Sequence, residues 1–119
     1  MVTASVLIVD DDAAFREIAA ELLRARGFSV IGRACDHDEA ISQANRLRPD
    51  AVLLDVHMGT SDALALTTRL IELDRNQRVL LTSSDPSAVT VDLVHRCGAI
   101  GFIAKADLVE TDLDDYLCR

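Results

Sequence analysis

Five short apolar runs recur along the chain and alternate with longer segments in which apolar residues recur at helical spacing. The runs are Val6–Val9, Phe28–Ile31, Ala51–Leu54, Val79–Leu81 and Ile100–Ile103. The first, third and fourth runs are almost continuously apolar, which is typical of parallel strands covered on both faces. Because strands that alternate with helices are joined by right-handed crossovers, the pattern predicts an α/β fold with a doubly wound parallel sheet.

Three of the intervening segments have the apolar stripe of a helix that packs on a sheet. The stripes are formed by Phe15, Ile18, Ala19 and Leu22, by Ala40, Ala44 and Leu47, and by Ala63, Leu66, Leu70 and Leu73. Gly27 follows the first helix as a terminating residue. Asp36 and Glu39 form a capping pattern at the start of the second, and Pro49 ends it. The third helix begins behind residues 60–62, any of which could cap it.

The fourth helix has weaker signals than the first three. Its expected start is Asp85-Pro86, because proline is favoured at the first helical position, and its expected end is Gly98. The segment is rich in β-branched residues, which lose rotamer freedom in a helix, and its apolar residues form no single stripe. We therefore expect this helix to be marginally stable. A short fifth helix is expected near Asp112–Cys118.

Polar side chains stand where four of the predicted strands end. Asp10 and Asp11 follow the first strand, Asp55 the third, Thr82 the fourth and Lys105 the fifth. Open parallel sheets place their functional groups at the carboxyl ends of the strands. We therefore expect three carboxylates, one hydroxyl and one ammonium to converge on one edge of the sheet.

The consecutive carboxylates at residues 10–12 repel one another, and each makes its neighbours harder to ionise. We expect Asp12 to cap the first helix, since aspartate is favoured there and one cap needs one carboxylate. The preceding pair is then available for a divalent cation, and Mg²⁺ prefers oxygen ligands of this kind. Such a site suits phosphoryl transfer, with Asp55 as the nucleophile, Lys105 neutralising the phosphoryl oxygens and Thr82 donating a hydrogen bond to them.

The composition predicts one soluble domain of 119 residues, 50% of them hydrophobic and 3% aromatic. A net charge of -8 argues against direct nucleic acid binding by this domain. No apolar run approaches the roughly 20 residues that span a membrane, and no signal peptide is evident. The cysteines at positions 35, 97 and 118 lack metal-binding spacing, so we expect reduced thiols in a cytoplasmic protein, with Cys118 the most exposed.

The strings VLIVDDD, LLDV, LLTSS and GAIGFIAK follow one another in a distinctive order and spacing. From about Ser5 to Leu117, the chain resembles the receiver domain of bacterial two-component response regulators, with features of the branch fused to helix-turn-helix DNA-binding domains. The resemblance implies a flavodoxin-like sheet of order 2-1-3-4-5 with five helices. It also implies that residues 1–119 are a single receiver domain, with no output domain in this chain.

The resemblance implies a phosphorylation-activated signalling switch rather than an enzyme, in which a sensor histidine kinase supplies a phosphoryl group to Asp55. Lys105 would contact that group, and Thr82 and Phe102 occupy the family's two switch positions. The implied Mg²⁺ ligands are Asp10, Asp11, Asp55 and the backbone carbonyl of His57. A homodimer through the fourth and fifth helices also follows from the resemblance.

Two positions depart from the pattern of the family. Gly59 stands where proline is common, and Ala106 follows Lys105 where many relatives have proline on a cis peptide bond. One alternative is a pseudo-receiver, a phosphorylation-independent interaction module, which the altered loop at Gly59 favours and the full set of charged residues disfavours. Another is a phosphate hydrolase of the haloacid dehalogenase type. It is disfavoured because His57 replaces that group's second aspartate and the chain is too short for the usual cap.

Overall fold

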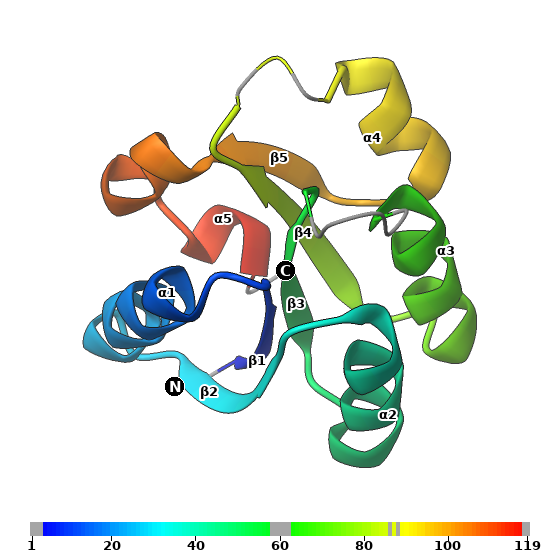
Figure 1. Cartoon of the computed structure of the whole chain (residues 1–119), viewed down its shortest axis with the longest axis horizontal. Helices are drawn as coiled ribbons and strands as arrows, with labels where there is room; N and C mark the ends of the chain where they lie inside the picture. Colours follow the sequence, from blue (N-terminus) through cyan, green and yellow to red (C-terminus); the bar gives the residue numbers. More distant parts are fainter. Residues whose placement is uncertain (1–3, 58–62, 86, 88, 118–119) are drawn as a thin grey trace.

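The computed structural model describes residues 4–57, 63–85, 87 and 89–117, and its strands form one parallel sheet (Figure 1). The strands are β1 (Ser5–Val9), β2 (Ser29–Ala34), β3 (Ala51–Asp55), β4 (Arg78–Ser83) and β5 (Gly101–Ala104). Their order across the sheet is β2-β1-β3-β4-β5. The predicted fold class and strand order are therefore confirmed.

Helices follow each of these strands. They are α1 (Ala13–Ala25), α2 (His37–Leu47), α3 (Ala63–Leu73), α4 (Val91–Cys97), the 3₁₀ helix η1 (Lys105–Glu110) and α5 (Asp114–Leu117). Within the described ranges the α-helices match the predicted five, and η1 is additional. Its sequence has no apolar stripe, and Leu108 is its one buried residue, so hydrophobic spacing could not have indicated it.

The two faces of the sheet are covered by different helices (Figure 1). Leu7 and Val9 of β1 pack with α2, α3 and α4, whereas Val6 and Ile8 pack with α1, η1 and α5. Successive side chains of a strand point to opposite faces, so a sheet buried on both sides needs apolar residues at consecutive positions. This burial explains the unbroken apolar runs in β1, β3 and β4.

Asp12 caps helix α1 as predicted, but the buried face of the helix is rotated from the predicted stripe. The Asp12 carboxylate accepts hydrogen bonds from the backbone N–H groups of Ala14 and Phe15 at 3.0 and 3.3 Å. The fully buried residues of α1 are Ala19, Ala20 and Leu23. Small alanines permit close approach to the sheet, and Ile18, predicted to face the core, is 58% exposed.

The predicted start of the fourth helix at Asp85 and Pro86 is wrong, and Pro86 itself lies outside the described residues. Helix α4 begins at Val91, and its cap is Thr90, whose hydroxyl accepts a hydrogen bond from the Leu93 N–H at 3.2 Å. The Thr90 backbone is extended, with φ -96° and ψ 159°. β-Branched residues favour this conformation over a helix, which explains why α4 is short.

The remaining predicted helix boundaries agree with the structure where it describes them. Asp36 caps α2 by accepting a hydrogen bond from the Glu39 N–H at 2.8 Å. Gly98 ends α4 with φ +88°, a left-handed conformation that glycine adopts without strain. The candidate caps of α3 at residues 60–62 lie outside the described residues.

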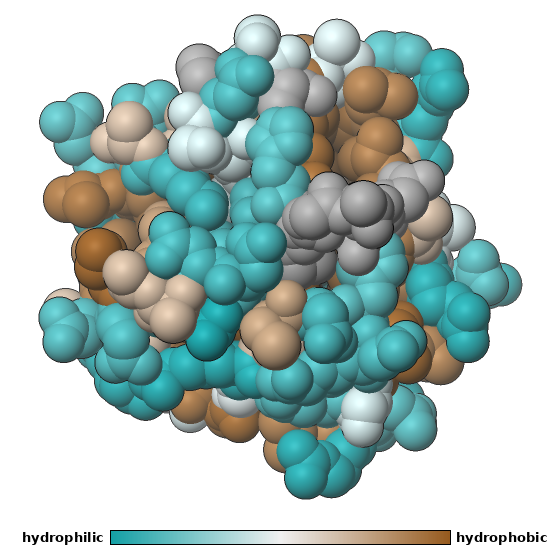
Figure 2. Space-filling model, viewed as in Figure 1, coloured by the Kyte–Doolittle hydropathy of each residue, from teal (hydrophilic) through white to brown (hydrophobic). Residues whose placement is uncertain are grey.

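Most of the surface seen in Figure 2 is hydrophilic, with hydrophobic side chains in small groups. Cys97 is buried and Cys35 is exposed, whereas Cys118 lies outside the described residues. Within the described ranges, no helix has the length and apolar character that crossing a membrane requires.

Candidate functional site

The register of the sheet brings the predicted polar residues to one edge. Val9 pairs with Leu54, so Asp10 and Asp55 follow directly at the ends of neighbouring strands. Asp55 in turn pairs with Thr82 of β4. Parallel pairing therefore places the carboxyl ends of β1, β3 and β4 side by side, as predicted from the sequence.

Asp10, Asp11 and Asp55 form an acidic cluster at this edge. Each offers a carboxylate oxygen, and these oxygens all lie within 4.8 Å of one another. Asp10 and Asp55 are only 1% and 3% exposed, whereas Asp11 is exposed. Asp10 is held in place because its Oδ1 accepts a hydrogen bond from the Asp12 N–H at 2.8 Å.

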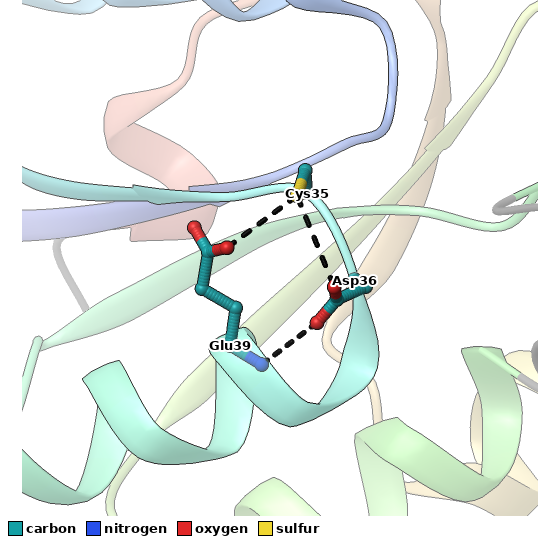
Figure 3. Close-up of side chains that lie close together, drawn as sticks. All are labelled: Cys35, Asp36 and Glu39. Atoms are coloured by element: carbon teal, nitrogen blue, oxygen red, sulfur yellow. Dashed lines mark hydrogen bonds between the residues drawn. The ribbon is translucent and has the colours of Figure 1, made fainter.

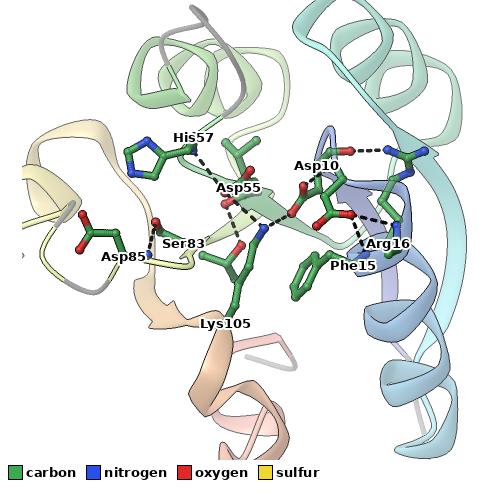
Figure 4. A network of polar contacts seen from close by, with 12 residues as sticks. Asp10, Phe15, Arg16, Asp55, His57, Ser83, Asp85 and Lys105 are labelled. Atoms are coloured by element: carbon green, nitrogen blue, oxygen red, sulfur yellow. Dashed lines mark hydrogen bonds and ion pairs between the residues drawn. The ribbon is translucent and has the colours of Figure 1, made fainter.

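Lys105 reaches the acidic cluster from the end of β5 (Figure 4). Its Nζ lies 2.7 Å from Asp10 Oδ2 and 3.7 Å from Asp55 Oδ1. The Lys105 side chain is 17% exposed, so both ion pairs are shielded from water. The peptide bond between Lys105 and Ala106 is trans. No cis peptide bond occurs in the part of the chain that the structure describes.

Burial raises the pKa of Asp55 from 3.8 to about 6, and repulsion from Asp10 contributes in the same direction. Two neighbours oppose this rise. The His57 N–H donates a hydrogen bond to Asp55 Oδ1 at 3.2 Å, and the Lys105 ammonium attracts the carboxylate. The carboxylate of Asp55 is thus costly to ionise in the protein alone, which favours a bound cation nearby.

The acidic cluster fits a hard divalent cation. Its ligands are all oxygens, and three carboxylates face a single ammonium, so Lys105 alone cannot neutralise them. Mg²⁺ and Ca²⁺ both bind through carboxylate oxygens, and Mg²⁺ usually retains several waters. Asp11 is exposed, so its carboxylate is accessible to water.

Of three further predicted residues, Thr82 and His57 adjoin Asp55, and Phe102 lies on β5. The Thr82 hydroxyl is buried and donates a 3.5 Å hydrogen bond to the Leu54 carbonyl. His57 contributes its backbone N–H to Asp55, and its imidazole points away from the acidic cluster in Figure 4. Phe102 lies on the neighbouring strand, half-buried, where it pairs with Leu81 and contacts the core on the side of α4.

Two residues of α1 contact this site and were not predicted to do so. The Phe15 ring lies under Lys105, with Nζ 4.2 Å from its centroid. Arg16 donates a 2.6 Å hydrogen bond from its guanidinium to the Asp10 carbonyl. The sequence shows Phe15 only as part of a helical stripe, because the strand that brings Lys105 to it lies 90 residues away in the chain.

A second group of ligand-type side chains lies at the end of β2 (Figure 3). The Cys35 thiol donates to Glu39 Oε2 at 3.4 Å, and this hydrogen bond raises the pKa of Cys35. Metals bind the thiolate, which is disfavoured here, and Asp36 is already engaged as the cap of α2. Of the two groups among the described residues, the acidic cluster fits a metal better.

Similarity to known proteins points to one family. Residues 6–113 match the response regulator receiver domain family. A protein-glutamate methylesterase/protein-glutamine glutaminase of Xanthomonas oryzae is 35% identical over 114 residues, which make up 93% of this chain and 32% of that protein. The chain spans half or less of the first curated relatives it matches, namely 50%, 31% and 32% of their lengths.

Two solved structures share both the fold and a related sequence. A Burkholderia pseudomallei response regulator with a phosphorylated aspartic acid, calcium ion and citrate is 29% identical, with a TM-score of 0.84 over 96% of this chain and 66% of that one. A chain of the CheX–CheY–BeF3–Mg²⁺ complex of Borrelia burgdorferi is 28% identical, with a TM-score of 0.80 over 95% and 89%. Together with the family match over residues 6–113, these similarities show that the chain belongs to the response regulator receiver domains of two-component systems.

Proposed function

We propose that this chain is a phosphorylation-activated switch in which Asp55 accepts a phosphoryl group from a sensor histidine kinase, in the presence of Mg²⁺. The observation that carries the proposal is the acidic cluster with the Lys105 ammonium 3.7 Å from Asp55 Oδ1. Such a site is suited to hold a transferred phosphoryl group, because the ammonium, together with a cation held by the neighbouring carboxylates, would balance the negative charge of the added oxygens.

In the transfer, an Asp55 carboxylate oxygen attacks phosphorus. A new P–O bond forms to Asp55 as the bond from phosphorus to the donor's leaving group breaks, and the leaving group departs with the bonding electrons. Lys105, whose Nζ lies 3.7 Å from Asp55 Oδ1, would attract the phosphoryl oxygens. The chain thus assists its own modification without turning over a substrate, which is why we classify it as a signalling domain and not an enzyme.

Asp10, Asp11, Asp55 and the His57 carbonyl are the residues that would hold Mg²⁺. When bound, the ion neutralises charge that develops on the transferring group. Two solved relatives support this assignment, one described with calcium and a phosphorylated aspartic acid and the other with BeF3 and Mg²⁺. The oxygen-only ligand set of the acidic cluster supports it independently.

The proposed relay passes from Thr82 to Phe102. The Thr82 hydroxyl is bonded only weakly, at 3.5 Å from the Leu54 carbonyl, so a phosphoryl group on Asp55 would be a stronger acceptor for it. Phe102 lines a hollow of about 320 Å³ beside α4, together with Val94 and Tyr116. We therefore expect a movement of the Thr82 side chain on β4 to alter the packing of Phe102 on β5, and with it the surface beside α4.

The wider setting of the switch follows from the same assignment. We place it in the cytoplasm as a single receiver domain over residues 1–119, with the sensor kinase as partner and with a homodimer formed through α4 and α5. The net charge of -8 supports the proposal that this domain does not bind nucleic acid directly.

The alternative is a pseudo-receiver that binds partners without phosphorylation. The buried carboxylates of Asp10 and Asp55 disfavour it, because a purely structural surface would gain stability by losing them. Gly59, which replaces the proline common in the family and favours the pseudo-receiver, lies outside the described residues.

Incubation with acetyl phosphate and Mg²⁺ should add one phosphoryl group to the wild-type chain, detected by intact-mass measurement. Asp55→Ala should remain unmodified, because it lacks the attacking oxygen, whereas Asp38→Ala, which removes an exposed carboxylate from α2, should be modified like the wild type. An unmodified wild type would support the pseudo-receiver. Modification of Asp55→Ala would place the phosphoryl group on another residue.

The raised pKa of Asp55 predicts a pH-dependent gain in stability for Asp55→Asn in chelator. The folded state holds the Asp55 proton more tightly than the unfolded chain, so ionisation weakens the fold as pH rises from about 4 to about 6. Above pH 6, Asp55→Asn should be more stable than the wild type by about 1–3 kcal/mol, and this advantage should shrink toward pH 4. Urea unfolding at several pH values measures it, and a difference that does not change with pH would contradict the raised pKa.

The proposed relay predicts that Thr82→Val separates phosphorylation from its consequence. This variant keeps the shape of the side chain but lacks the hydroxyl that would contact the phosphoryl group. Phosphorylation should change amide hydrogen exchange in α4 of the wild type and of Thr82→Ser, and should leave it nearly unchanged in Thr82→Val. An equal change in all three proteins would exclude the Thr82 hydroxyl from the relay.

A further inference from the structure

The Phe15 side chain contacts the site through its ring face. Phe15 lies in the first turn of α1, half-buried, and packs against the hydrophobic cluster beneath α1 and α5. Its ring faces the Lys105 ammonium, with Nζ 4.2 Å from the centroid, and the two side chains lie side by side in Figure 4. A cation at this distance is attracted by the negative face of an aromatic ring.

Lys105 needs such a restraint because its side chain is intrinsically flexible. A lysine side chain has a flexible stem of four carbons, and fixing it in one position costs about 2 kcal/mol in conformational entropy. Asp10 at 2.7 Å and Asp55 at 3.7 Å restrain the ammonium on two sides. The Phe15 ring provides a third contact, so the three together define where Nζ lies.

The ring contact differs from the two ion pairs in one respect. A divalent cation in the acidic cluster would draw on the carboxylates of Asp10 and Asp55, which also attract Lys105, and so weaken both ion pairs. The Phe15 ring carries no net charge and lies outside the acidic cluster, so its attraction for the ammonium is kept when the carboxylates are engaged. Phe15 can then hold Lys105 beside Asp55 when phosphorylation takes place.

We infer that Phe15 is a positioning residue for phosphoryl transfer, which acts by holding the Lys105 ammonium over its ring; this inference rests on the proposed function. A simpler role for Phe15 is filling the core beneath α1. That role needs only an apolar side chain, so leucine would serve it. The positioning role needs the electrons of an aromatic ring, and the two can be separated by experiment.

The test measures the initial rate of phosphorylation by acetyl phosphate and Mg²⁺ under subsaturating donor. Replacement of Phe15 by mono-, di- and trifluorophenylalanine keeps its shape and progressively weakens the negative face of the ring. The logarithm of the rate should fall stepwise along this series, and Phe15→Leu should be about threefold to tenfold slower than the wild type. In a Lys105→Met background, the same Phe15 changes should have no further effect, because the cation is absent.

Phe28→Leu is the matched control. Phe28 is 5% exposed and belongs to the same hydrophobic cluster, but it lies at the start of β2, away from the site. This variant should lower the midpoint of thermal unfolding and leave the phosphorylation rate unchanged at temperatures well below that midpoint. It therefore separates a loss of stability from a loss of positioning.

Equal rates across the fluorinated series, or equal effects of Phe15→Leu with and without the Lys105 ammonium, would overturn the inference. If the wild type itself is not modified on Asp55, the proposed function fails instead. NMR then tests whether the Phe15 ring contacts Lys105. The ring should shift the Lys105 Hε resonances upfield, and Phe15→Leu should abolish that shift. An unshifted Lys105 in the wild type would overturn the positioning role whatever the phosphorylation result.

Discussion

The repulsion among three carboxylates at one edge of the sheet is the constraint on which this molecule depends. Asp10 and Asp55 are buried, and the single ammonium of Lys105 leaves the acidic cluster short of positive charge. A structural protein would replace such groups with apolar residues at a gain in stability. In the function that we propose, a divalent cation supplies the missing positive charge, which explains why these carboxylates are kept.

The rest of the fold fixes where these charges lie. Parallel pairing of β1 with β3 aligns Val9 with Leu54, and the side chains of these two strands pack into a hydrophobic cluster on each face of the sheet. The helices on either side bury those residues, and the carboxyl ends of β1, β3 and β5 bring Asp10, Asp55 and Lys105 together.

The features that could be predicted from the sequence are those that depend on residues close together in the chain. Apolar runs indicated the strands, the residues at their carboxyl ends indicated the site, and the caps at Asp12 and Asp36 were readable from local chemistry. The wrong start of α4 has a local cause too: Thr90 offers a hydroxyl cap in an extended backbone, and it outweighs the proline signal upstream. By contrast, the packing of Phe15 on Lys105 joins residues 90 positions apart and leaves no trace in spacing.

The central claim is that a divalent cation relieves the charge of the acidic cluster, and calorimetric titration with Mg²⁺ tests it most directly. The wild type should bind one Mg²⁺ per chain, Asp10→Asn should bind it much more weakly, and Asp38→Asn, which lacks only an exposed carboxylate, should bind like the wild type. No binding by the wild type, or equal binding by Asp10→Asn, would contradict the account.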